Sequence, residues 1–241
     1  MIEKLYDIYL RHPKVSIDTR KISKGCLFFA LKGPNFNANE FAITALEKGA
    51  SYAVVDEEKY VIDERYILVE DALETLQKLG KHHRKYINCP VLGITGTNGK
   101  TTSKELCFQV LKQEFKTIAT AGNLNNHIGV PLTLLSIPTD TEFAIIEMGA
   151  NHIGEIDFLC NIAEPNYGVI TNVGKAHLEG FGSLNGVLQT KTELYRYLSK
   201  NSRPVFIKDN QQILIEKTPN NCEKISFGQQ TDSTWHIGYK G

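Results

Sequence analysis

Five short apolar stretches, rich in β-branched residues, alternate with helical segments from residue 90 onward. They are PVLGIT, FKTIATA, EFAIIEM, YGVITNV and PVFIKD. Strands that are apolar on both faces are typical of a parallel sheet covered by helices on each side. The alternation therefore predicts a doubly wound, mostly parallel α/β domain, whose ligands bind beyond the carboxyl ends of its strands.

Residues 1–88 differ from this pattern and predict a small α/β domain of their own. A helix is expected over Glu40–Lys48, because Gly49 readily adopts the left-handed conformation that ends helices. A polar helix, ALETLQKLGKHHRKY, must end before Pro90, since proline disfavours helix in the preceding residue. We therefore place a boundary between domains 1–88 and 89–241, and we interpret the cluster KHHRK as a solvated helix end. The expected strands of the first domain are CLFFALK (26–32), YAVVD (52–56) and YILVED (66–71).

The composition excludes several classes of protein. Lys plus Arg and Asp plus Glu number 27 each, so no net charge attracts nucleic acid or an anionic membrane. The five cysteines show no metal-ligand spacing and are typical of a reducing compartment. No apolar stretch approaches the ~18 residues of a membrane span. We expect a cytoplasmic, monomeric protein that binds neither nucleic acid nor membrane. The last residues, STWHIGYKG, stop within an expected strand, so we also expect an incomplete second domain.

The loop after the first strand of the second domain carries the strongest functional signal. It resembles the phosphate-binding pattern G-x-x-x-x-G-K-[ST], except that Ile94 stands where the first glycine belongs. Between a strand and a helix, backbone N–H groups and the helix dipole bind phosphate, which favours a nucleotide site over a plain glycine-rich turn. In the helix that follows, we expect Leu106, Val110 and Leu111 to be the apolar stripe. The expected nucleotide-binding residues are Thr95, Gly96, Thr97, Asn98, Gly99, Lys100, Thr101 and Thr102.

Four side chains near this edge of the sheet are candidates for chemistry. Lys100 is expected to contact the terminal phosphates, and the Thr101 hydroxyl to bind Mg²⁺. Glu147 ends the strand EFAIIEM, where a carboxylate is a natural Mg²⁺ ligand, with a solvent-exposed glutamate as the alternative. His177 follows the strand YGVITNV, although a lone loop histidine is more often a surface residue.

Lys191 occupies the middle of an apolar helical stripe. In VLQTKTELYRYL the stripe consists of Val187, Leu194, Tyr195 and Leu198. A lysine among them must extend to the surface, pair with an anion, or lose its charge. With a lowered pKa it could also take up CO₂ as a carbamate, which would convert a cation into a metal-binding anion.

These motifs resemble the Mur ligase family over nearly the whole chain. The matching blocks are SIDTRKISKGCLFFALKG (16–33), TGTNGKTT (95–102), GNLNNHIGVPLTLL (122–135), EMGANHIGEI (147–156), TNVGKAHLEGFGS (171–183) and the helix of Lys191. The resemblance implies an ATP-dependent, ADP-forming ligase, in which ATP phosphorylates a carboxylate and an amine attacks the acyl phosphate. The third and fourth blocks are most similar to members that add D-alanyl-D-alanine to a UDP-N-acetylmuramoyl-tripeptide in peptidoglycan synthesis, and hence in cell-wall formation and division.

The resemblance also implies roles for individual residues. The positions that match catalytic residues of the family are Lys100, Asn123, His177 and Lys191. Two Mg²⁺ ions are implied, one bound by Thr101 and Glu147, the other by His177 and an N-carbamylated Lys191. The block that matches the family's UDP-sugar-peptide site contains Ser16, Asp18, Thr19 and Arg20.

Two departures from the family pattern bear on function. Asn37-Ala38-Asn39 replaces the usual Asp-Gly-His, which puts nucleotide contacts there in doubt. The family's C-terminal domain, which binds the dipeptide and completes the adenine pocket, is not supplied by these residues, so we expect this chain alone to bind substrates without turnover. Two alternatives stay open: a related Mur or folylpolyglutamate-type ligase with another acceptor, and a non-catalytic nucleotide-binding module.

Overall fold

The chain forms two compact units in a computed structural model that describes residues 1–174, 181–229 and 232–236. The first unit contains Met1–Ile87 and Pro131–Pro138, and the second contains Asn88–Val130 and Thr139–Gly241. A single cut in the sequence therefore does not separate the units, because one segment from the middle of the chain belongs to the first. None of the helices within the described residues combines the length and hydrophobicity that a membrane span requires.

The first unit contains a four-stranded parallel sheet with the order β1-β2-β5-β6, and β3 and β4 form a separate antiparallel pair. Its strands are β1 Val15–Ser16, β2 Leu27–Phe29, β3 Lys32–Gly33, β4 Phe36–Asn37, β5 Tyr52–Val55 and β6 Tyr66–Leu68. Its helices are α1 Ile2–Arg11, α2 Ala42–Glu47 and α3 Ala72–Tyr86, with short 3₁₀ turns at Thr19–Lys21, Ala38–Phe41 and Glu58–Tyr60. The helix expected from residue 40 thus begins as a 3₁₀ turn, and Gly49 ends α2 with a φ of 105°.

The C-terminal end of α3 is only partly solvated, although the sequence predicted a fully solvated helix end. His83 and Arg84 are buried, and the His83 ring is within hydrogen-bond distance of the Tyr6 hydroxyl (3.0 Å) and the Ile137 carbonyl (2.8 Å). The Tyr9 hydroxyl donates to the carbonyl of Leu135, which lies in the same segment as Ile137, at 2.7 Å. These contacts hold residues 131–138 in the first unit. The prediction was wrong for His83 and Arg84 because a basic cluster in sequence does not reveal which of its members face a neighbouring helix.

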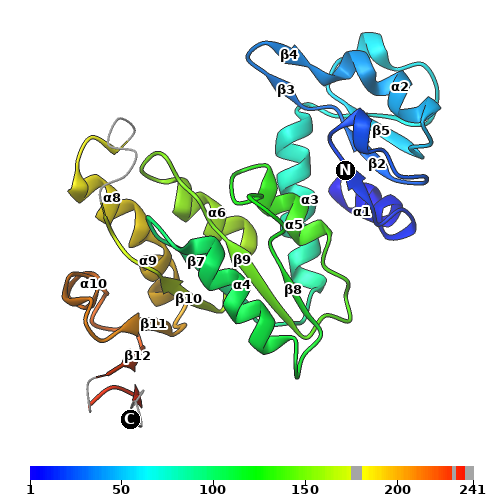
Figure 1. The fold of residues 1–241 in the computed structure, drawn as a ribbon. Helices are drawn as coiled ribbons and strands as arrows, with labels where there is room; N and C mark the ends of the chain where they lie inside the picture. The colour runs from blue at the N-terminus through cyan, green and yellow to red at the C-terminus, as the bar shows by residue number, and fades with distance from the viewer. Residues whose placement is uncertain (175–180, 230–231, 237–241) are drawn as a thin grey trace. The chain divides into compact units, whose positions relative to one another are not determined.

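The second unit contains a seven-stranded, wholly parallel sheet with the order β13-β12-β11-β10-β7-β9-β8. Its strands are β7 Val91–Thr95, β8 Thr117–Ala119, β9 Phe143–Glu147, β10 Tyr167–Ile170, β11 Val205–Lys208, β12 Lys224–Gly228 and β13 Trp235–His236. Its helices are α4 Lys100–Leu111, α6 Glu155–Ala163, α8 Leu184–Lys191, α9 Glu193–Lys200 and α10 Gln212–Lys217, while α5 Gly129–Leu135 lies mostly in the first unit (Figure 1). All five predicted strands are present, and the predicted α/β class is confirmed.

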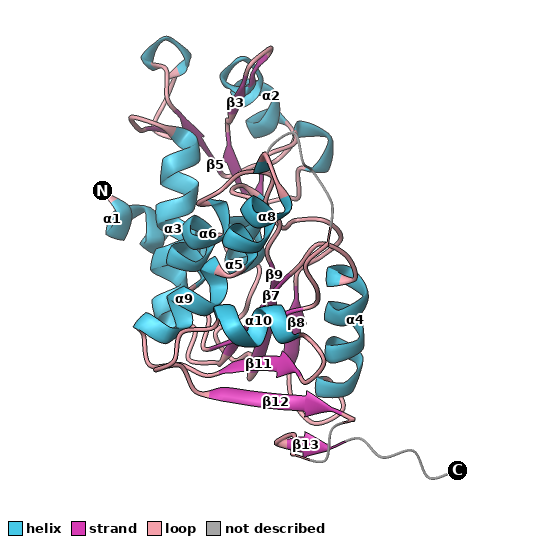
Figure 2. Cartoon of the chain, turned by 90° about the vertical axis from the view of Figure 1, so that its left-hand side faces the viewer, coloured by secondary structure: helices cyan, strands magenta, loops and turns pink. Residues whose placement is uncertain are grey.

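Helices cover both faces of this sheet, with α4 on one side and α6, α8 and α9 on the other (Figure 2). On the α4 side, Leu92, Ile94 and Ile145 pack against a stripe formed by Cys107, Phe108 and Leu111. The predicted stripe was therefore wrong at two of its three members: Leu106 is 63 % exposed and Val110 is 70 % exposed. The helix is rotated so that a fully buried lysine, Lys104, lies on the inner side instead.

The opposite face of the sheet brings α9 close to the strands. A Cβ atom at Gly168 would lie 2.4 Å from Leu198, so the helix packs directly on the strand backbone there. The predicted single helix around Lys191 is divided at Thr192, between α8 and α9. The stripe itself is confirmed, because Val187, Leu194, Tyr195 and Leu198 are all fully buried.

Candidate functional site

The loop between β7 and α4 is held in a conformation that favours glycine at two positions. Gly96 has a φ of 146° and Gly99 a φ of 76°. A Cβ atom at Gly96 would lie 2.0 Å from the Thr171 hydroxyl, whereas one at Gly99 would meet nothing within 4 Å. Lys100 folds back over the loop and donates to the carbonyls of Gly96 (2.9 Å) and Thr97 (3.1 Å). Burial lowers the pKa of Lys100, although the Glu147 charge opposes that effect.

The segment after β10 braces this loop along its length. The Thr97 N–H donates to the Asn172 carbonyl, and the Asn98 N–H donates to the Asn172 side chain, both at 3.0 Å. In return, the Asn98 carbonyl accepts hydrogen bonds from Thr171 Oγ1 (2.6 Å) and Asn172 Nδ2 (2.9 Å). Because these two adjacent strands end at the same edge of the sheet, the loop shape is fixed by residues more than seventy positions later in the sequence.

Glu147 ends β9 beside the start of α4 and is only 1 % exposed, so the solvated alternative does not apply. Its Oε1 accepts hydrogen bonds from Asn125 Nδ2 (2.8 Å) and Thr101 Oγ1 (3.3 Å). Its Oε2 is buried with no hydrogen-bond partner among the described residues. A buried carboxylate oxygen without a partner is costly, and a bound cation would satisfy it.

Lys191 is 3 % exposed and enters the cavity from the C-terminal end of α8. Burial, together with the charge of Lys100, lowers its pKa to about 8, while Glu193 and Glu155 act in the opposite direction. Its Nζ lies over the ring of Phe181, 5.4 Å from the ring centroid. Lys191 therefore does not snorkel to solvent, and a substantial neutral fraction exists at mildly alkaline pH.

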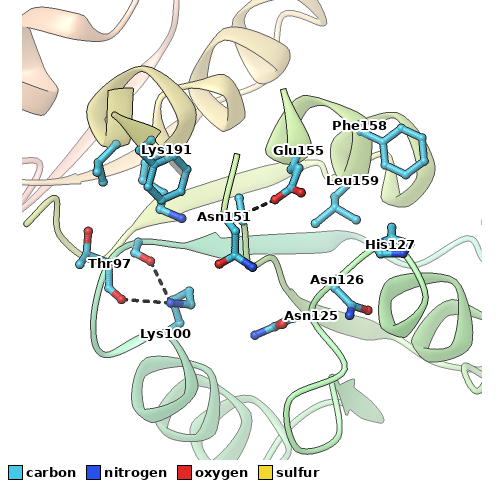
Figure 3. A pocket seen from close by; sticks show the side chains of 15 residues that line it. Thr97, Lys100, Asn125, Asn126, His127, Asn151, Glu155, Phe158, Leu159 and Lys191 are labelled. Carbon is cyan, nitrogen blue, oxygen red and sulfur yellow. Dashed lines mark hydrogen bonds between the residues drawn. The ribbon is translucent and has the colours of Figure 1, made fainter. Parts of the chain in front are cut away.

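Lys100 and Lys191 line one cavity of about 350 Å³ in the second unit. Figure 3 shows the two ammonium groups entering this cavity from different elements, with Asn125, Asn126 and His127 on a further side. The remaining wall follows the start of α6. The residues that line the cavity are Gly96, Thr97, Lys100, Asn125, Asn126, His127, Gly149, Ala150, Asn151, Glu155, Phe158, Leu159, Phe181, Val187 and Lys191.

The structure therefore brings some of the sequence-predicted residues together and leaves others apart. Asn123 is exposed and does not line the cavity, and sequence reasoning missed Asn125, which contacts Glu147. Asn125 could have been noticed in GNLNN, but no spacing rule selects one asparagine from three. His177 lies outside the described residues. Thr95 is buried and donates from its hydroxyl to the Met148 carbonyl at 2.8 Å, and Thr102 is exposed on α4.

The chemistry of the residues present fits a divalent cation next to Glu147. A hard cation prefers oxygen ligands, and a partnerless carboxylate oxygen beside the Thr101 hydroxyl provides them. Within the described ranges, no three His, Cys, Asp or Glu residues come together as a preformed metal cluster. Bound phosphate and water would have to complete the coordination, as is usual for Mg²⁺.

The predicted nucleotide-sugar residues lie together in the first unit. Asp18 and Arg20 form a bidentate ion pair with a shortest distance of 2.8 Å, and the Ser16 hydroxyl donates to the Asp18 carbonyl at 3.0 Å. Asp18, Thr19 and Arg20 line a second cavity, together with the stacked rings of Phe36 and Phe41, whose centroids are 5.4 Å apart.

The departure at Asn37 and Asn39 has a structural explanation. Asn39 is buried; its Nδ2 donates to Asp56 Oδ1 at 2.7 Å, and its Oδ1 accepts from the Asp56 N–H at 3.0 Å. Asn37 Nδ2 donates to Glu57 Oε1 at 2.9 Å. Both asparagines therefore tie this turn to the end of β5.

A parallel, doubly wound sheet with a glycine-dependent loop between an inner strand and a helix defines an α/β domain of the phosphate-loop class. Two family models match the chain: the Mur ligase middle domain over residues 94–240, and the catalytic domain of the Mur ligase family over residues 13–84. The chain belongs to the Mur ligase family.

Individual members of the family are similar to this chain over most of its length. A UDP-N-acetylmuramoyl-tripeptide–D-alanyl-D-alanine ligase of Haemophilus influenzae is 44 % identical over 206 residues, covering 84 % of this chain and 45 % of that protein. The ligase of the same name from Bacillus subtilis is 36 % identical over 225 residues, covering 92 % and 49 %. The crystal structure of the MurF ligase of Thermotoga maritima in complex with ADP matches with a TM-score of 0.82 and 32 % identity, covering 92 % and 51 %. The chain thus spans about half the length of the curated relatives it matches.

Proposed function

We propose that this chain forms the nucleotide-sugar and ATP-binding parts of a ligase that adds D-alanyl-D-alanine to a UDP-N-acetylmuramoyl-tripeptide. The observation that carries the proposal is the juxtaposition of the Lys100 loop, the partnerless Glu147 oxygen and buried Lys191 around one edge of the sheet. The named relatives support the substrates, and the ADP bound to the Thermotoga maritima ligase supports the nucleotide.

Lys100 and the loop would bind the phosphates of ATP. The Lys100 ammonium donates hydrogen bonds to two carbonyls of the loop itself, those of Gly96 and Thr97, so it can exchange them for phosphate oxygens without leaving the loop. The first N–H groups of α4 point to the same region and add the partial positive charge of the helix N-terminus. Phosphoryl transfer to a carboxylate needs alignment and charge neutralisation more than covalent help, and these groups provide both.

Glu147 and Thr101 would hold one Mg²⁺, and Lys191 with His177 a second. When bound, Mg²⁺ neutralises phosphate charge and orients the transferred group. Lys191 would contribute as a carbamate: its neutral amine adds to dissolved CO₂, one proton is released to solvent, and an N-linked carboxylate results. Burial supports this chemistry because the amine is poorly solvated as a cation and has a lowered pKa. Counted from the ammonium, which loses a first proton to become the neutral amine, two protons leave in all, and a positive side chain becomes a negative one next to a cation.

The experiment that tests the nucleotide part is calorimetric titration of the chain with a non-hydrolysable ATP analogue and Mg²⁺. Lys100→Ala should weaken binding by on the order of 10²-fold, about 3 kcal/mol, because a preorganised cation facing the phosphates is lost. Lys112→Ala is the matched control, since this lysine lies at the opposite end of α4. Equal affinities for Lys100→Ala and the wild type would make the loop a structural turn.

A second titration tests the nucleotide-sugar part. A UDP-N-acetylmuramoyl-tripeptide should bind the whole chain without ATP, and Arg20→Ala should weaken that binding. Arg65→Ala is a matched control, because Arg65 pairs with Asp63 in the same i, i+2 geometry away from the cavity. If the chain binds ATP but no nucleotide sugar, the non-catalytic nucleotide-binding module becomes the better description. Binding of a different acceptor substrate would favour a folylpolyglutamate-type or another Mur ligase.

A further inference from the structure

Lys104 is a fully buried lysine that does not line the cavity of the candidate nucleotide site. It lies on α4 one turn after Lys100, and its side chain has 0 % exposure. A buried ammonium is costly unless it is paired and hydrogen-bonded, so its partners indicate what it does. It forms an ion pair with Glu105 Oε1 at 2.9 Å, and Glu105 itself is half exposed. Its second partner is the Thr120 carbonyl, at 2.6 Å.

Thr120 connects this lysine to Glu147. The residue follows β8 and is 1 % exposed, and its N–H donates to the Ile145 carbonyl at 2.9 Å. Its hydroxyl accepts the backbone N–H of Glu147 at 2.9 Å. The Lys104 ammonium, the Thr120 backbone and hydroxyl, and the Glu147 N–H therefore form one continuous chain of contacts. All three residues are buried, and the carboxylate of Glu105, which pairs with Lys104 from outside, is half exposed.

The segments that Lys104 and Thr120 belong to also meet at the Glu147 carboxylate. Its Oε1 accepts from Thr101, three residues before Lys104 on the same helix, and from Asn125, five residues after Thr120. Lys104 thus joins the helix that carries Thr101 to the segment that leads to Asn125. The two side chains that donate to the Glu147 carboxylate therefore stand on segments that the Lys104 ammonium connects. Glu147 Oε2 has no hydrogen-bond partner among the described residues.

We propose that Lys104 is a positioning residue for the metal site, which sets the Glu147 carboxylate against the phosphate-binding end of α4. The inference rests on the proposed role of Glu147 as a Mg²⁺ ligand. A carboxylate oriented by outer hydrogen bonds binds a metal more tightly, because fewer conformations are lost on binding. Without the ammonium, α4 and the end of β8 lose their polar connection, and the Thr101–Glu147 spacing becomes less defined.

The test is the Mg²⁺ dependence of ATP-analogue binding by the whole chain. Lys104→Met keeps the length and packing of the side chain but removes its charge and donors. It should raise the Mg²⁺ concentration for half-maximal tightening by about tenfold or more, as substitutions of outer partners of metal ligands do. Affinity for the analogue without Mg²⁺ should remain unchanged. Thr120→Val should show the same signature, and Thr120→Ser, which keeps the hydroxyl, should not.

Glu105→Gln is the matched control, because it alters the exposed partner of Lys104 and leaves the contact with Thr120 in place. A Mg²⁺ titration for Lys104→Met equal to the wild type, with only a lower melting temperature, would overturn the inference and leave a purely structural lysine. An equal loss of affinity with and without Mg²⁺ would overturn it as well. Glu147→Gln separates the two levels: if it changes the Mg²⁺ dependence and Lys104→Met does not, the inference alone fails, and if neither does, the proposed metal role of Glu147 fails with it.

Discussion

Gly96→Ala is expected to disrupt the phosphate loop far more than Gly99→Ala, although both glycines have positive φ. At Gly99 the new methyl group meets nothing within 4 Å, so only the backbone conformation opposes it, at about 1–2 kcal/mol. At Gly96 the backbone cost, about 1–3 kcal/mol, is joined by a Cβ placed 2.0 Å from Thr171 Oγ1. Relieving such overpacking costs a further ~1–3 kcal/mol. The loss of unfolded-state entropy is common to both substitutions and cancels in the comparison.

The difference between the two variants is therefore about 2 kcal/mol, with Gly96→Ala the less stable. Urea unfolding followed by circular dichroism measures it. With a denaturant slope of ~2 kcal/mol/M, the midpoint of Gly96→Ala should lie ~1 M below that of Gly99→Ala. Calorimetric titration should also show weaker ATP-analogue binding for Gly96→Ala, because the backbone of the loop must move away from Thr171.

A double-mutant cycle identifies the clash as the cause. Thr171→Ala removes the overlapping hydroxyl and, alone, costs about 1 kcal/mol because its 2.6 Å hydrogen bond to the Asn98 carbonyl is lost. When Thr171→Ala is introduced into the Gly96→Ala variant, it should cost less stability than it does in the wild type, or even stabilise the protein. The coupling energy between the two substitutions is therefore about 1–2 kcal/mol. Relief is partial, since the Thr171 N–H would still lie 3.1 Å from the new Cβ. Equal midpoints for the two glycine variants, or strict additivity in the cycle, would refute the reasoning.

Three further outcomes are expected. ¹³C-labelled bicarbonate should give a carbamate NMR signal that Mg²⁺ and an ATP analogue strengthen and Lys191→Ala abolishes; a signal that persists in the variant would contradict carbamylation of this lysine. Burial lowers the pKa of His83 below its usual 6.5, so between the two values the unfolded chain binds more protons, and stability should fall as the pH drops below 6.5. Urea midpoints measured from pH 7.5 to 5.0 should fall with pH in the control variant His82→Gln and fall less in His83→Gln. If the midpoints of the two variants fall equally with pH, His83 is not the cause. Glu193→Gln should lower the free energy of unfolding, measured with urea, by about 1–3 kcal/mol. The Glu193 carboxylate accepts two backbone N–H groups at the start of α6, at 2.8 and 3.0 Å, whereas an amide has one acceptor oxygen. An unchanged midpoint would mean that water replaces the lost acceptor.

Local sequence was sufficient wherever the signal repeats along one element. The five apolar strands, the position of Glu147 at a strand end and the burial of the stripe around Lys191 all follow from periodicity within a few residues. Backbone requirements are local as well: Gly49 adopts the left-handed angle that its position after a helix predicted.

Tertiary structure decided which of several chemically similar residues faces the site. Asn125 rather than Asn123 contacts Glu147, because the backbone turns after Ala121 and the Asn125 carbonyl is held by the Gly149 N–H, just beyond the end of β9. The inner side of α4 carries Lys104 instead of Leu106, a choice that apolar periodicity cannot anticipate since the lysine is stabilised by the Thr120 carbonyl.

The same holds for contacts that join distant parts of the chain. The brace from Thr171 and Asn172 to the phosphate loop spans more than seventy residues, and the His83 contact with Ile137 spans 54. Such hydrogen bonds depend on which strands become neighbours, and strand order is fixed by packing of the whole sheet rather than by any short stretch of residues. The sequence determined the elements and the loop that a phosphate would meet; only the folded chain determined which side chains converge around it.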